Sequence, residues 1–125
     1  MNIRALSLPL AAAIGLALAS FGCKQSGPPE PLPAEQAPTE LTQAFTKARP
    51  ELKDLASRAS AALQGNRYPE ASAILVELSH TPDLGATERE MVTRSMLTVN
   101  RLLQEAQAKG DPQAAEHLRR LQQSK

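Results

Sequence analysis

The sequence predicts an all-α fold, either a small antiparallel helical bundle or two stacked helix hairpins. Aromatic residues are only 2% of the 125-residue chain, whereas alanine and leucine are abundant. Small and unbranched side chains lose little freedom in a helix, and strands favour β-branched and aromatic ones. From residue 40 onward, apolar residues recur at spacings of three and four, which is the period of one helical face. The chain length allows one small domain.

Residues 1–22 have the composition of an export signal. A short basic start at 1–4 precedes residues 5–19, which are apolar except for Ser7. A membrane-spanning helix needs roughly 20 apolar residues, whereas the core of a signal peptide needs about 7 to 15. We therefore expect residues 1–22 to be a signal peptide that is removed on export.

Gly22 and Cys23 follow this apolar run, and Cys23 is the only cysteine of the chain. The segment resembles the signal of bacterial lipoproteins, in which a small residue precedes a cysteine that receives a diacylglyceryl group. The resemblance implies cleavage between Gly22 and Cys23 and a lipid anchor on Cys23. Since Lys24 stands where an aspartate favours inner-membrane retention, the resemblance also favours the outer membrane.

Two alternatives to lipid attachment stay open. Cleavage after Ala17-Leu18-Ala19 would release a soluble periplasmic or secreted protein with a free thiol, and Cys23 could instead form an intermolecular disulfide. A lone cysteine in an oxidising compartment has no internal disulfide partner, which favours its use in acylation.

Residues 23–38 form the expected linker between anchor and domain. Five prolines and few apolar side chains lie in this stretch. Such a composition favours a disordered or polyproline II spacer, which could extend to about 45 Å at roughly 3.1 Å per residue. The helical domain is expected to cover residues 39–125.

Proline and glycine divide this domain into helices. A common apolar stripe predicts either a kinked helix or two helices, at about 40–48 and 50–64, because Pro50 interrupts the pattern. Gly65 and Asn66 end this unit. Tyr68 to Ser79 is the next predicted helix, with a proline in its first turn.

The stretch from Gly65 to Pro82 resembles the second half of a tetratricopeptide repeat. Its glycine, Tyr68, the pair Glu70-Ala71, later aliphatic positions and the closing proline stand near the positions of that pattern. The resemblance implies a helix-hairpin architecture of the tetratricopeptide type.

The longest predicted helix covers roughly 87 to 109. Thr87 and Glu90 have the spacing of a capping box, and the helix closes at Gly110. Asp111 as a cap and Pro112 in the first turn then predict one more helix. The layout is therefore four or five antiparallel helices.

Charge and side-chain chemistry favour a non-enzymatic protein. Arg4 is the only charged residue before Cys23, so the remaining chain carries thirteen basic and thirteen acidic side chains. The two signs are interspersed, which argues against nucleic-acid binding. His80 is expected at a helix end and His117 on a solvated polar face, and no catalytic motif, cofactor motif or metal-ligand spacing occurs.

Three residues are candidates for an interaction face: Tyr68, Met91 and Met96. Methionine adapts to varied partners, although a buried central helix would explain the two methionines as well. The expected function is a lipid-anchored periplasmic scaffold or adaptor that binds an envelope protein, with a homodimer as one way to cover apolar surface. A structural envelope tether without a specific ligand and a soluble secreted binding protein are the alternatives.

Overall fold

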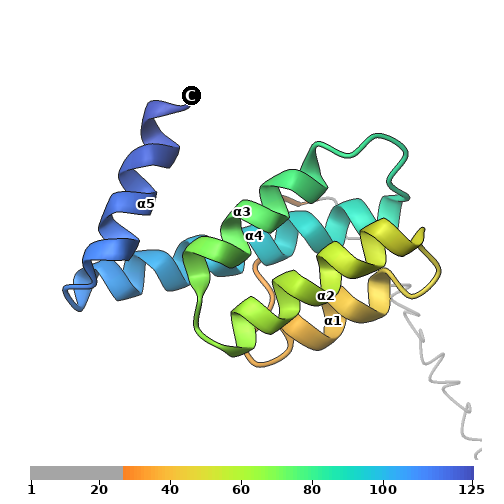
Figure 1. Ribbon diagram of the computed structural model, residues 1–125, viewed down its shortest axis with the longest axis horizontal. Coiled ribbons are helices and arrows are strands. Elements are labelled where there is room, and N and C mark those ends of the chain that lie inside the picture. The colour runs from red at the N-terminus through yellow and green to blue at the C-terminus, as the bar shows by residue number, and fades with distance from the viewer. Residues whose placement is uncertain (1–26) are drawn as a thin grey trace, which may run out of the picture.

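The computed structural model describes residues 27–125, and in this part of the chain the only regular secondary structure is helical (Figure 1). The predicted all-α class is therefore confirmed. Five helices follow one another along the chain: α1 (Ala37–Ala44), α2 (Pro50–Gln64), α3 (Tyr68–Ser79), α4 (Ala86–Ala108) and α5 (Pro112–Gln123).

The first four helices form a closed bundle. Helix α2 packs against both α1 and α3, and α4 packs against α3 and returns to α1. Helix α5 follows the carboxyl end of α4 and projects from that end of the bundle, where it contacts α4 and, more weakly, α3 (Figure 1).

The core is made of small and aliphatic side chains with one aromatic ring. Its largest fully buried members are Phe45, Leu41, Leu75, Leu78 and Leu103. Many of the remaining core positions are alanines, which allow neighbouring helices to approach closely but contribute little buried area each.

The helix boundaries follow the prolines and turn residues of the sequence. Pro50, Pro69 and Pro112 each lie in the first turn of a helix, where the missing N–H costs no hydrogen bond. Asn66 has φ 58° and Gly110 has φ 92°, so both turns use the left-handed region that these residue types tolerate. Of the two arrangements predicted around Pro50, the structure has two separate helices.

The predicted capping box is wrong. Helix α4 begins at Ala86 with Gly85 as its N-cap, and no side chain caps it. Thr87 therefore lies inside the first turn, two residues after the N-cap position and too late to accept the orphan amide hydrogens as a cap.

The linker predicted for residues 23–38 differs most from the structure. Leu32 is 3% exposed, and Ala37 and Pro38 are buried at the start of α1. The hydroxyl of Ser60 donates to the carbonyl of Pro38 (2.9 Å), which joins this stretch to α2. Its second half is therefore part of the domain, and the packed unit begins before residue 39.

No helix between residues 27 and 125 is both long enough and apolar enough to cross a membrane.

Candidate functional site

Helix α5 has the fewest buried residues of the five described helices. Ala114 is its only buried residue, while Leu118 and Leu121 are half-buried. Its start is nevertheless well defined, because Asp111 Oδ1 accepts hydrogen bonds from the amides of Gln113 (2.9 Å) and Ala114 (3.4 Å). The predicted cap at Asp111 is thus confirmed.

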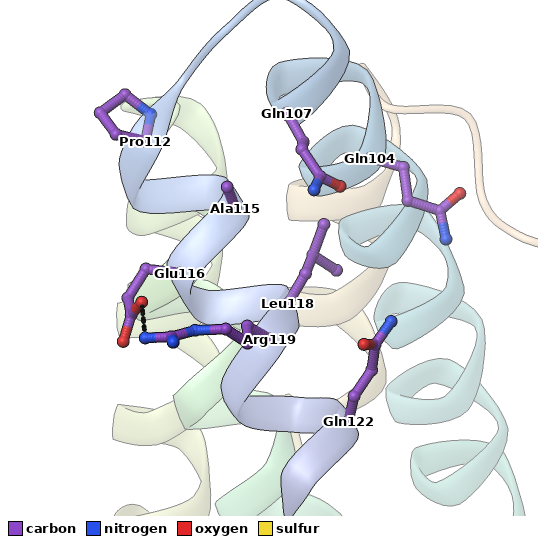
Figure 2. A pocket seen from close by; sticks show the side chains of 8 residues that line it. All are labelled: Gln104, Gln107, Pro112, Ala115, Glu116, Leu118, Arg119 and Gln122. Carbon is purple, nitrogen blue, oxygen red and sulfur yellow. Dashed lines mark hydrogen bonds and ion pairs between the residues drawn. The ribbon is translucent and has the colours of Figure 1, made fainter.

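A groove of about 720 Å³ lies between α4 and α5 (Figure 2). Leu118 points from α5 toward α4, and Gln107 points from α4 toward Leu118. The residues that line the groove are Gln104, Gln107, Pro112, Ala115, Glu116, Leu118, Arg119 and Gln122. The lining is mostly polar, with Pro112, Ala115 and Leu118 as its apolar part. Such a mixed groove suits a peptide or a helix, since each glutamine amide both donates and accepts hydrogen bonds.

The charged edge of this groove is internally paired. Glu116 accepts from Arg119 and from Arg120, whose Nε lies 3.0 Å from Oε1, so α5 carries a three-residue ion cluster on its surface. The hydrogen bond from Arg119, then that from Arg120, lowers the pKa of Glu116 below its usual 4.5. The cluster is exposed and therefore contributes little to stability.

His117 lies on a different side of α5, beside the start of α3. With Pro69, Pro112 and Arg120 it lines a hollow of about 350 Å³. Its Nε2 is enclosed without a hydrogen-bond partner, and burial, followed by the charge of Arg120, lowers the pKa of His117 below 6.5. The expectation of a solvated His117 is therefore wrong, because α5 turns this ring toward α3.

Of the three residues proposed as one interaction face, Tyr68 and Met91 lie well apart in space. Tyr68 shares a hollow with Leu102 of α4 and donates its hydroxyl hydrogen to Asn66 Oδ1 (3.0 Å). Met91 precedes Leu102 by eleven residues, or about 16 Å along a helix. Tyr68, Met91 and Met96 are all partly buried against the core. They do not form a single exposed patch.

The remaining predicted site residues divide into two groups. His80 is at the end of α3, where its Nδ1 lies 2.9 Å from the carbonyl oxygen of Val76, in line with the expected helix-end position. Gly22 and Cys23 lie outside the described residues. Among residues 27–125, no group of three or more potential metal ligands comes together.

The sequence predicted α5 and its apolar positions but did not predict the groove. Gln104 and Gln107 look like ordinary surface residues of a long helix, and only the packing angle of α5 gives them a common site with Leu118. The one feature of the sequence that could have indicated the groove is the turn at Gly110. It is followed by a short amphipathic helix that is joined to only one other helix, the long one before it.

Comparisons with known proteins found no family model, no curated protein and no solved structure that matches this chain.

Proposed function

We propose that the protein is a lipid-anchored, non-enzymatic adaptor of the bacterial cell envelope. In this proposal Cys23 carries the lipid in the periplasmic leaflet of the outer membrane, and the groove between α4 and α5 binds a segment of an envelope protein. The proposal combines the lipoprotein-like signal with the exposed groove.

The observation that supports a binding role for the groove is that most residues of α5 are not buried. This helix presents Leu118 and Ala115 to a groove that no part of residues 27–125 fills. A groove between two helices that places a few apolar side chains among polar groups is one of the places where peptides and helices bind. The neutral amides of Gln104 and Gln107 offer hydrogen bonds to a main chain without demanding a charged partner.

Site-specific photocrosslinking in cells tests the binding part. A photoreactive side chain at Gln107 is expected to give one dominant crosslinked product, whereas the same group at Arg58, exposed on α2, gives none. Mass spectrometry then identifies the product. Crosslinks only to peptidoglycan or to a second copy would instead support the structural tether.

The mass of the mature amino terminus tests the anchor. We expect an acylated Cys23 as the first residue, and Cys23→Ser is expected to move the protein from the outer-membrane fraction to the soluble periplasm. An unmodified amino terminus at Ser20, with unchanged fractionation of Cys23→Ser, would support the soluble alternative.

A further inference from the structure

The segment before α1 runs along α4 in a fixed register. The carbonyl oxygen of Glu30 accepts from Arg94 Nε (2.9 Å), and that of Leu32 accepts from Thr98 Oγ1 (2.7 Å). Two residues of extended polyproline chain rise about 6.2 Å, and four residues of α-helix rise about 6.0 Å. The two carbonyls are therefore spaced to meet successive turns of α4.

The same register continues on both sides of these hydrogen bonds. Gly27 shares a surface hollow with Thr87, near the amino end of α4, and Ala34 shares another with Leu102. The segment thus runs parallel to α4 from its first turn to its second half. We call residues 27–35 the clip. Besides its hydrogen bonds to α4, the clip has a buried side chain, that of Leu32, and Thr98, which donates to the Leu32 carbonyl, is fully buried.

The clip shortens the tether between the anchor and the domain. Only three residues separate Cys23 from Gly27. Four residue steps of fully extended chain span at most about 14 Å. A spacer that ran free to Pro38 would have allowed about 45 Å.

The groove lies at the opposite end of α4. Gly27 is beside the first turn of this 23-residue helix, whereas Gln104, Gln107 and α5 are beside its last turns. A helix of that length extends about 34 Å. Figure 1 shows α5 projecting from this far end of the bundle.

We infer that the clip orients the anchored domain, with the amino end of α4 on the bilayer side and the α4–α5 groove directed away from the membrane. This inference rests on the lipid anchor of the proposed function. A partner would then be bound at about the length of α4 from the anchoring end, because the short tether keeps the amino end of α4 as the part of the domain closest to the anchor.

Paramagnetic relaxation enhancement tests the orientation. The chain from Cys23 onward is coupled through its thiol to a maleimide lipid in phosphatidylcholine nanodiscs that contain a gadolinium-chelating lipid. We expect enhancement of amide relaxation to be strongest at residues 83–90 and to fall by at least about tenfold toward α5, because the effect decays with the sixth power of a distance that grows by about 30 Å along α4.

A variant without the clip hydrogen bonds provides the comparison. The double change Arg94→Ala and Thr98→Val is expected to flatten the gradient while the helical circular dichroism is retained. Equal enhancement at residues 83–90 and in α5 of the unaltered chain, or stronger enhancement in α5, would overturn the inference whether or not the double variant folds.

Chemical coupling separates this test from that of the anchor. The gradient reports only how the domain is held when lipid is present at Cys23. Whether cells place lipid there is decided by the mass of the native amino terminus, so one proposal can fail without the other.

Discussion

Thr98 is a polar residue with no exposed surface, and its hydroxyl explains its burial. The hydroxyl lies 2.7 Å from the carbonyl oxygen of Leu32 and 3.1 Å from that of Arg94, so the hydroxyl and the Leu32 carbonyl each have a partner. Buried polar groups are tolerated when they are paired in this way. Thr98 therefore joins segments that lie 66 residues apart.

The change Thr98→Val is expected to lower the free energy of unfolding by about 1–2 kcal/mol, because it keeps the shape and leaves the Leu32 carbonyl without its partner. Urea unfolding followed by circular dichroism measures it. Thr93→Val is the matched control, since Thr93 is exposed and its hydroxyl donates only within α4, to Arg89. Equal losses in the two variants would contradict the role given to the clip.

His117 is expected to make stability depend on pH. Its pKa is lowered in the folded protein by burial and then by the charge of Arg120. The unfolded chain has a pKa of about 6.5 at this residue, so between the two values it binds more protons than the folded chain. Stability is then fully present above the unfolded pKa and is lost as pH falls through about 6.5 toward the lowered value.

Urea midpoints at pH 7.5 and 5.5 measure this loss. His117→Gln is expected to remove most of the difference, while His80→Gln, at an exposed position, is expected to retain it. The pKa of Glu116 is lowered from 4.5, so its own contribution is lost only as pH falls below about that value and leaves this window unaffected. A pH dependence that persists in His117→Gln would refute the assignment.

Among the elements, α4 and α5 begin in different ways although the sequence suggested a side-chain cap for both. Asp111 accepts two amide hydrogen bonds at the start of α5, whereas Thr87 lies within the first turn of α4 and caps nothing. Both residues belong to types that favour helix starts. Asp111 stands at the N-cap position itself, whereas Thr87 stands two residues past it, and this difference in position decides which side chain acts as a cap.

Alanine substitution distinguishes the two starts. Asp111→Ala is expected to cost about 1 kcal/mol and to speed amide hydrogen exchange in α5, because two orphan N–H groups lose their acceptor. Thr87→Ala is expected to change stability by less than about 0.5 kcal/mol, as is usual for surface positions without a special role. If Thr87→Ala were the more damaging change, the helix start at Ala86 would be wrong.

Helices and their limits could be predicted from sequence where the signals are local. Pro50, Pro69 and Pro112 each lie in the first turn of a helix as expected, and the turn at Asn66 follows the end of one. Long-range packing could not be predicted in this way. Leu32 stands alone among prolines, so no apolar period marks it, and Thr98, which donates to its carbonyl, is 66 residues later.

At the scale of the whole molecule, a segment without regular secondary structure contributes more to the core than one of the helices does. The clip has no helix, yet it places Leu32 in the core and makes two hydrogen bonds to α4. Helix α5 has twelve residues but only one that is buried. The groove likewise could not be predicted, because it depends on the angle at which α5 leaves Gly110.

Two truncations test whether the clip contributes more to stability than α5 does. A chain that ends at Gly110 is expected to keep a cooperative unfolding transition and the helical content of α1–α4, because α5 buries only Ala114 completely. Removing residues 27–33 exposes the surface under Leu32 and removes the Leu32 carbonyl from Thr98, whose hydroxyl then has only the Arg94 carbonyl as an acceptor. Burial of one leucine contributes about 1.5–3 kcal/mol, and the two hydrogen bonds add about 1 kcal/mol each.

The shorter deletion is therefore expected to lower the unfolding temperature more per residue removed than the loss of α5. Differential scanning calorimetry of both variants beside the unaltered chain measures the effect. The chain ending at Gly110 should also give no crosslink from Gln107, since half of the groove is gone, whereas removal of 27–33 should leave that crosslink in whatever fraction stays folded. A truncation at Gly110 that abolished cooperative unfolding would show that α5 is part of the core after all.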